Sequence, residues 1–387
     1  MIEFDVIVVG CGLSGAVVAR QLADAGRRVL ILEKRDHIAG NMFDYVDEHG
    51  ILVHKYGPHT FHTNDKELFN YICKYSKWDD YKLKCGAEIN GICTPTPFNF
   101  KTIDQFYSLE EADELKRHIK LVFGDRKKAT VVEALNSDDE LIKNYAQFLF
   151  DNDYSLYTAK QWGISASEID SSILKRVPLR FSYDEGYFDD KYQVMPHHSY
   201  TEFFNRLLDS DRITVRLNTD ALDMLSILSN NQVEYNGSIF DGIVVFTGAL
   251  DALFNYRFGK LPYRSLRFEW HYENIESKQQ LPVVAYPQAE GFTRIVEYSK
   301  LPVQKGKGTT YEIEYSFQAD DYSEQEPYYP VLTKYSQYKY ELYKSLAGKV
   351  KNLYLCGRLA EFKYYNMDQA LQHALEVSEI IVKRRII

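Results

Sequence analysis

The sequence predicts an α/β protein with a parallel-sheet domain assembled from distant segments, a helical insertion and an antiparallel sheet. A strand, a glycine-rich turn, a helix and a second strand follow one another in residues 6–35, "VIVVGCGLSGAVVARQLADAGRRVLILEKR". Another strand, turn and helix, "NLYLCGRLAEF" and "DQALQHALEVSEIIVKR", close the chain. Between these ends lie helix-periodic and then alternating segments. Together these observations indicate a Rossmann-like domain that two other regions interrupt.

The first element is a dinucleotide-binding turn. The apolar, β-branched run 4–9 is typical of a buried parallel strand, and Gly10, Gly12 and Gly15 follow it as G-x-G-x-x-G. The glycines allow a tight turn, close approach of a pyrophosphate and close packing of the helix, whose N-terminus attracts phosphate. Glu33 ends the second strand, 18 residues after Gly15, where a ribose-binding carboxylate is expected. The alternative is a tight strand–helix turn that holds no ligand.

The middle of the chain predicts two further regions. "SLEEADELKRHIKLVFGD" and "DDELIKNYAQFLF" have helical spacing, after the proline-broken stretch "CTPTPFNF". Residues 174–200 and 262–330 alternate like antiparallel strands, as in "RSLRFEWHY" and "TTYEIEYSF". "DGIVVFTG" indicates another buried strand of the nucleotide domain.

These segments divide the chain into three domains and favour one cofactor. We expect a FAD-binding domain of residues 1–77, 200–260 and 340–387, a helical domain of 100–172 whose edge is a mobile loop, and an antiparallel substrate domain of 78–99, 173–199 and 261–339. A nicotinamide dehydrogenase usually completes its dinucleotide fold in one block. A glycine turn completed by a distant C-terminal strand, Gly-Arg turn and helix therefore favours FAD over NAD.

Composition excludes several classes of protein. The chain has 387 residues and a formal net charge of −9, which argues against nucleic acid or an acidic membrane as its partner. Its five cysteines form no CxxC pair, so neither a disulfide framework nor a zinc site is expected. The first strand begins almost at Met1, leaving no room for a signal peptide, and no apolar run approaches the roughly 20 residues of a membrane span. We expect a cytoplasmic protein without bound metal.

Six long motifs resemble the UDP-galactopyranose mutase family across nearly the whole chain. They are "EKRDHIAGN", "HKYGPHTFHT", "YTAKQWG", "SSILKRVPLRFSYDEGYF", "EPYYP" and "GRLAEFKYYNMD". The resemblance implies an isomerase that interconverts UDP-galactopyranose and UDP-galactofuranose, supplying galactofuranose for bacterial cell-surface polysaccharide. It also implies a homodimer with non-covalent FAD, active when reduced by NAD(P)H or another reductant. In the family, N5 of the reduced flavin displaces UDP and forms an adduct with the sugar C1.

The resemblance also implies roles for individual residues. Arg176 of "LKRVP" and Arg294 of "FTRI" match arginines that hold the diphosphate, and His62 matches a residue near the flavin, giving three catalytic candidates. The substrate-binding candidates are Tyr154, Thr158, Trp162, Tyr187, Tyr329, Tyr364 and Asn366. The cofactor-binding candidates are Gly10, Gly12, Leu13, Ser14, Gly15, Glu33, Lys34, Gly40, Asn41, His59, Arg358, Met367 and Asp368. Asp368 is expected to start the last helix, as a cap or beside the flavin. The i, i+3 pair His59 and His62 suggests a metal, but no third ligand accompanies it.

The sequence departs from the family in the nucleotide-sugar pocket. Tyr154 substitutes for a phenylalanine common before "YT-KQWG", Ala285 falls near a family asparagine, and Asn366 replaces an aspartate of several relatives. A sister mutase for dTDP-fucopyranose or UDP-N-acetylgalactopyranose is therefore the main alternative. An FAD-dependent amine oxidase or desaturase is a second one, and a flavin-free prenylated-GTPase escort protein is a third.

Overall fold

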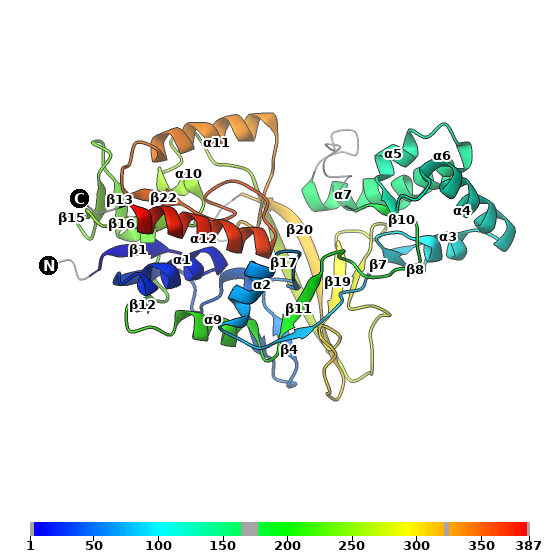
Figure 1. The fold of residues 1–387 in the computed structure, drawn as a ribbon, viewed down its shortest axis with the longest axis horizontal. Helices are drawn as coiled ribbons and strands as arrows, with labels where there is room; N and C mark the ends of the chain where they lie inside the picture. The colour runs from blue at the N-terminus through cyan, green and yellow to red at the C-terminus, as the bar shows by residue number, and fades with distance from the viewer. Residues whose placement is uncertain (1–3, 164–176, 321–324, 385–387) are drawn as a thin grey trace.

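The protein has a nucleotide-binding lobe and a helical lobe, joined through a large, mostly antiparallel sheet. The computed structural model describes residues 4–163, 177–320 and 325–384. Figure 1 shows the parallel sheet with its helices at one end of the molecule and α3 to α6 at the other, with β17 to β20 between them. This arrangement confirms the predicted fold class, including the helical insertion.

The core of the first lobe is a five-stranded parallel sheet built from both ends of the chain. The strand order is β12-β2-β1-β16-β22, and every neighbouring pair runs parallel. The strands are β1 (Val6–Val9), β2 (Val29–Leu32), β12 (Ile213–Arg216), β16 (Ile243–Phe246) and β22 (Leu353–Leu355). The four residues of β1, β2 and β16 are all buried, which explains why their sequences are continuous apolar runs.

Helices cover both faces of this sheet. Val6 and Val8 pack with one set of helices, whereas Ile7 and Val9 pack with the other, as the two-residue period of a strand requires. The first set is α1 (Leu13–Asp24), α2 (Lys66–Cys73), α9 (Tyr200–Leu208) and α12 (Met367–Lys383). The second set is α10 (Leu250–Leu253) and α11 (Lys334–Ala347), beside the small sheet of β13 (Leu225–Ile227), β14 (Val233–Tyr235) and β15 (Ser238–Ile239).

A seven-stranded sheet leads from this lobe toward the helical lobe. Its order is β21-β17-β20-β19-β18-β7-β8, and only the pair β18 and β7 runs parallel. The strands are β7 (Cys85–Ile89), β8 (Ile92–Thr96), β17 (Tyr263–Glu273), β18 (Val283–Ala285), β19 (Arg294–Glu297), β20 (Thr309–Ala319) and β21 (Tyr329–Pro330). The two longest strands coincide with the alternating stretches that the sequence singles out.

The helical lobe packs around its own apolar core at the far edge of that sheet. Its helices are α3 (Phe100–Phe106), α4 (Leu109–Phe123), α5 (Val131–Leu135) and α6 (Glu140–Leu149). The helix continues from α6 through a π-helical turn, η2 (Phe150–Tyr154), into α7 (Ser155–Trp162). π-helical turns inside α-helices are frequent at functional sites.

Short strands and turns complete the fold. They are β3 (Asp44–Val46) with β4 (Leu52–His54), β5 (Phe61–Thr63) with β11 (Tyr192–Pro196) and β6 (Trp78–Asp80), β9 (Lys128–Ala129) with β10 (Leu179–Arg180), and the 3₁₀ turns η1 (Gly40–Met42) and η4 (Ala221–Asp223). In the region 174–200 the described part therefore has only two strands, β10 and β11, and β11 joins a separate three-stranded sheet. The domain ranges stay a prediction, and the boundary at residue 340 falls inside α11.

Candidate active site

Glycines at the β1–α1 turn leave a cradle of backbone beside the N-terminus of α1. A Cβ on Gly15 would lie 2.0 Å from the carbonyl oxygen of Gly10, so only glycine allows α1 to approach the turn this closely. A Cβ on Gly40 would lie 2.7 Å from the Cα of Gly12, which brings η1 against the same turn. No side chain caps α1 at Gly12, so the first turn, Leu13 to Gly15, presents its N–H groups to a ligand.

Glu33 braces this turn from the end of β2. Its two carboxylate oxygens accept the backbone N–H of Cys11 at 2.6 Å and of Arg35 at 3.0 Å, and the residue is 5% exposed. The carboxylate therefore fixes the glycine loop, and its remaining lone pairs are free for a ribose hydroxyl. The predicted ribose contact stays a prediction.

The segment after Glu33 is held from the large sheet. Arg35 donates to the Oδ1 of Asn41 at 2.8 Å and to the Oε1 of Glu326 at 2.9 Å, and Lys34 Nζ lies 4.0 Å from the same Glu326 oxygen. Glu326 is the first residue of "EPYYP", so this motif lies across the end of the nucleotide turn.

The C-terminal turn after β22 meets the glycine turn. The Gly357 N–H donates to the buried carboxylate of Glu361 at 2.8 Å, and a Cβ on Gly357 would lie 3.1 Å from Ser14 Oγ. α12 begins at Met367 and Asn366 is its N-cap, with its backbone N–H bonded to the side chain of Gln369. The prediction that Asp368 starts this helix is wrong: the residue lies in the first turn, after Met367.

Two arginines and two tyrosines form the wall next to this turn. The Arg358 guanidinium lies 5.1 Å from the ring centroid of Tyr329 and 5.2 Å from that of Tyr364, and the two rings stack with centroids 5.7 Å apart. Arg358 also donates to the carbonyl of Tyr365 at 2.8 Å. Burial raises the pKa of the Tyr329 hydroxyl, and the charges of Arg358 and Arg294 oppose this shift, so both guanidinium groups lie within electrostatic reach of that tyrosine.

Arg294 is fixed by a buried carboxylate on the neighbouring strand. Its Nε and Nη2 donate to Oε2 of Glu314 at 2.9 and 2.6 Å, and Glu314 lies directly opposite it in the β19–β20 register. The Glu314 side chain is fully buried, and its other oxygen accepts from Thr293 Oγ1 at 3.2 Å. No described residue bonds to Nη1 of Arg294. The guanidinium is therefore held in place with one nitrogen available for an anion.

α7 forms the opposite wall. Tyr157 lies within electrostatic reach of Arg294, Glu314, Tyr187 and Tyr329, and burial raises the pKa of its hydroxyl. Thr158 is buried next to it, whereas the side chain of Trp162 lies outside the described part.

Tyr154 packs differently from the residues of this wall. It belongs to the core of the helical lobe, where its hydroxyl donates to the Val177 carbonyl at 2.8 Å.

The histidines have separate surroundings. His59 Nδ1 donates to the Gly57 carbonyl at 2.7 Å, and its ring lies near both Arg358 and Arg294. Burial lowers the pKa of His59 to about 4, so the ring is neutral at pH 7 and Nε2 is an acceptor. His62 instead bonds to Asp190 at 2.8 Å and stacks on Phe188 at 3.6 Å. The catalytic role of His62 stays a prediction.

The structure thus gathers His59, Tyr187, Arg294, Tyr329, Arg358 and Tyr364 from the predicted set. Arg176 lies outside the described residues. Tyr157 and Glu314 were not predicted. Tyr157 is the first residue of "YTAKQWG", and Glu314 is a charged residue on the buried face of an alternating strand, so both carried a signal in the sequence.

This arrangement suits an anionic ligand with an aromatic or sugar portion. Two guanidinium groups supply charge and directed donors, and four tyrosines supply flat apolar faces with polar tips. Across the described ranges, no three His, Cys, Asp or Glu side chains are grouped as metal ligands would be. Within the same ranges, no helix combines the length and apolar character needed to cross a bilayer.

The chain is similar to known proteins over most of its length. A family model described as UDP-galactopyranose mutase matches residues 153–364, and one described as an NAD(P)-binding Rossmann-like domain matches residues 8–75. A UDP-galactopyranose mutase of Mycoplasma genitalium is 37% identical over 378 residues, which cover 95% of this chain and 92% of that protein. A dTDP-fucopyranose mutase of Escherichia coli is 33% identical over 383 residues, 98% of each chain. A crystal structure of a reduced UDP-galactopyranose mutase superposes with a TM-score of 0.72 over 99% of this chain and 94% of that one, at 12% identity, which shows a shared fold.

Proposed function

The chain belongs to the UDP-galactopyranose mutase family, a family of flavin-dependent isomerases, and from this membership we propose that it interconverts UDP-galactopyranose and UDP-galactofuranose. The observation that carries the proposal is the paired placement of Arg294 and Arg358 among Tyr157, Tyr329 and Tyr364, next to a glycine-lined nucleotide turn. A site that binds both a dinucleotide and a nucleotide sugar needs cationic and aromatic side chains directly beside the dinucleotide turn.

The residues present fit FAD. The space kept open by Gly12, Gly15 and Gly40, at an uncapped helix N-terminus, suits a pyrophosphate, and Glu33 suits a ribose. We assign Arg358 and the N-terminus of α12 to the flavin end. When bound and reduced, the flavin supplies the nucleophilic nitrogen that holds C1 of the sugar while the ring opens.

The chain's own side chains bind and orient the substrate. Arg294, immobilised by Glu314, holds the diphosphate and stabilises the charge that develops as it leaves. Tyr187, Tyr329 and Tyr364 contact the diphosphate and sugar, and α7 closes the opposite side. We assign Arg176 the second arginine position on the diphosphate. His59, with a neutral acceptor nitrogen, suits a sugar hydroxyl.

A second substrate is supported by a specific observation. The dTDP-fucopyranose mutase relative covers this chain as fully as the UDP-galactopyranose mutase relatives do. Product analysis by anion-exchange chromatography distinguishes the two. Dithionite-reduced protein is incubated anaerobically with UDP-galactofuranose or with dTDP-fucofuranose, and we expect the higher kcat/KM for the UDP sugar. A preference for the dTDP sugar would keep the mutase reaction and change the substrate.

The oxidation state of the flavin tests the reaction class. We expect the reduced protein to turn over and the oxidised protein to be inactive, because only the reduced flavin is nucleophilic. Equal turnover in both states, or no flavin after acid extraction, would contradict the proposal. We also propose a homodimer, which sedimentation velocity tests.

A further inference from the structure

Lys160 is the charged residue of "YTAKQWG", and the proposed reaction gives it no role. It lies on α7 between Thr158 and Trp162 and is half-buried. Its Nζ donates to three backbone carbonyl oxygens, those of Tyr286 at 2.5 Å, Ala289 at 2.8 Å and Phe292 at 2.9 Å. An ammonium group has three N–H donors, so this set of carbonyls uses all of them.

The three carbonyls belong to one turn. Residues 286–293 connect β18 to β19, and Arg294 follows Phe292 by two residues. The turn closes on itself through the Tyr286 N–H to the Thr293 carbonyl, at 2.9 Å. Lys160 therefore binds a compact turn that continues directly into the strand carrying the diphosphate-binding arginine.

The same helix carries the other wall of the site. Tyr157 lies one turn before Lys160, and its hydroxyl is within electrostatic reach of Arg294 and Glu314. The end of α7 is also fixed to the sheet, because Arg264 donates to the Gln161 carbonyl at 2.9 Å and to the Lys160 carbonyl at 3.1 Å. Lys160 is thus the described side chain that ties α7 to the turn leading into β19.

We propose that Lys160 is a positioning residue that sets the width of the substrate cleft between α7 and β19. The inference rests on the proposed function, because it takes the space between Tyr157 and Arg294 to be the substrate's. A charged side chain on three neutral carbonyls, with no ion pair among the described residues, is costly to bury. A lysine at this position is explained if substrate binding needs the spacing between α7 and the β18–β19 turn that Lys160 fixes.

The protonation of Lys160 gives a second readout. Burial lowers the pKa of Lys160 to about 8, and the carboxyl of Asp153 opposes this shift. The guanidinium of Arg264 faces the same helix end, and the β18–β19 turn presents only carbonyls to Nζ. Above this pH the neutral amine has two donors for three carbonyls, so the KM for the nucleotide sugar is expected to rise.

The test compares Lys160→Met with Lys143→Met, an exposed lysine on α6 whose nearest carboxylate oxygen lies 3.8 Å away. FAD content, the Kd for UDP and the KM and kcat for UDP-galactofuranose are measured for both variants and the native protein. We expect Lys160→Met to raise the Kd and KM at least about tenfold, because it removes all three charge-assisted hydrogen bonds to the turn and a single one contributes about that much, with FAD content unchanged. It should also lose the alkaline rise in KM. Lys143→Met should match the native protein.

The outcomes separate the inference from the function on which it rests. A native protein that binds neither UDP nor dTDP contradicts the proposed function itself. If the native protein binds UDP and Lys160→Met binds it equally well, the positioning role is wrong. Loss of FAD in Lys160→Met would also overturn the inference, because the lysine would then support the fold. Gln288→Ala gives a further check: Gln288 joins the turn to Asn152 at the exposed side, and its loss should change KM less than twofold.

Discussion

Two glutamates on the buried face of β20 differ in ion pairing because of their positions. Glu314 is paired with Arg294, whereas Glu312, two residues earlier, is fully buried and forms no ion pair among the described residues. Burial raises the pKa of Glu312 well above its usual range, which favours the neutral form of this carboxyl. The same residue type thus fixes the substrate-binding arginine at one position and fills the interior at the other.

Asp153 gives a prediction about pH and stability. It lies in the π-helical turn η2 and is 8% exposed, and burial raises its pKa from 3.8 to about 7. A raised folded pKa means that the native state binds more protons than the unfolded state between pH 4 and pH 7. Ionising the buried Asp153 carboxyl therefore lowers the free energy of unfolding. This loss is absent below about pH 4 and complete above about pH 7. Asp153→Asn should remove this pH-dependent part, about 2–4 kcal/mol at pH 8.

The measurement is urea unfolding of the native protein and the variant at pH 5 and pH 8. Asp151→Asn, an exposed change two residues away, serves as the control. If the free energy of unfolding differs between pH 5 and pH 8 by the same amount in Asp153→Asn as in the native protein, burial does not raise the pKa of Asp153 in the folded protein.

Arg180 gives a prediction about a tyrosine of the site. Its buried guanidinium donates to the carbonyls of Gly186 and Tyr187, the latter at 3.3 Å, and to the Asp189 carboxylate at 2.5 Å. These bonds hold the irregular loop that carries Tyr187. Arg180→Gln should therefore raise the KM for the nucleotide sugar about tenfold, because charge-assisted hydrogen bonds contribute about 1.5–3 kcal/mol each.

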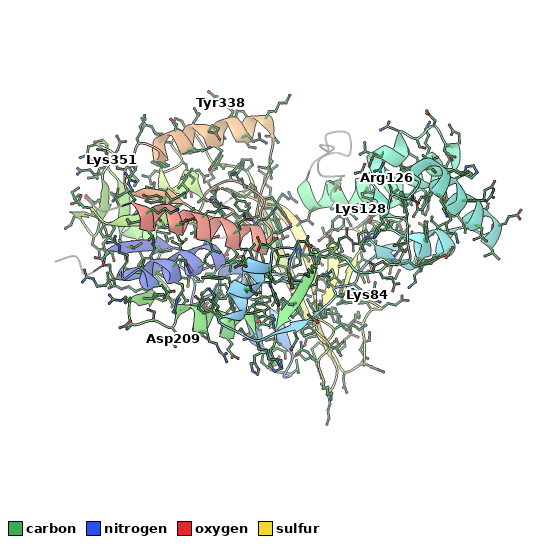
Figure 2. The ribbon with its side chains drawn as sticks, viewed as in Figure 1. Lys84, Arg126, Lys128, Asp209, Tyr338 and Lys351 are labelled. Carbon is green, nitrogen blue, oxygen red and sulfur yellow. The ribbon has the colours of Figure 1, made fainter. Side chains whose placement is uncertain are left out.

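Lys128→Gln is the matched control for Arg180. Lys128 bonds the same carboxylate from the exposed side, at 2.8 Å, and Figure 2 labels it near the boundary between the helical lobe and the sheet. Its loss should change KM less than twofold. Equal KM values in Arg180→Gln and Lys128→Gln would mean that the loop is held by its other contacts. Unchanged FAD content in both variants would confine the effect to substrate binding.

At the scale of elements, α12 shows how a helix at the end of the chain supports a turn near its beginning. α12 packs on α1 through a buried face that includes Leu371, Ala374 and Ile381. These residues follow the three- and four-residue spacing of one helix face. Ser378 is buried on the same face, where its hydroxyl donates to the Ala374 carbonyl at 2.6 Å.

Two adjacent isoleucines test this packing. Ile381 is 1% exposed, whereas Ile380 is 58% exposed on the other side of the helix. Ile381→Ala should lower the free energy of unfolding by about 2–5 kcal/mol, the cost of a core cavity, whereas Ile380→Ala should change it by less than about 0.5 kcal/mol. Urea unfolding followed by circular dichroism measures both variants. Similar losses in the two variants would mean that α12 does not pack by this face in solution.

At the scale of the whole molecule, the nucleotide lobe depends on segments from both ends of the chain. β22 is the edge strand beside β16, and it delivers Gly357, Arg358 and α12 to the glycine turn. Figure 1 shows α12 alongside α1, and Figure 2 places Lys351, just before β22, at the far end of this lobe. The lobe therefore cannot be complete without the last strand and helix.

A chain that ends at Gly348 tests this dependence. It lacks β22 and α12, so we expect it to retain no FAD after gel filtration, because the C-terminal half of the proposed cofactor site is missing. Flavin released by acid is measured against protein, with the full-length chain as the reference. A truncated chain that keeps its full FAD content would assign the cofactor to the N-terminal segment alone.

The sequence by itself determined the elements that depend on local pattern. Continuous apolar runs mark the buried parallel strands, glycine spacing marks the β1–α1 turn, and two-residue alternation marks β17 and β20, because burial on one or both faces imposes these periods. The six motifs also predicted the family, which the comparisons confirmed. Alternation was less reliable in residues 174–200, where the described part is mostly irregular and β11 pairs with β5 and β6.

Only the tertiary structure decided which of these residues meet. Arg294 and Glu314 are 20 positions apart and become partners through strand register, and Lys160 reaches the Tyr286 carbonyl across 126 positions. It also showed that Tyr154 bonds within the helical lobe whereas Tyr157 lies near the arginines. Such contacts depend on how strands and helices pack together, and no local pattern in the sequence records that packing.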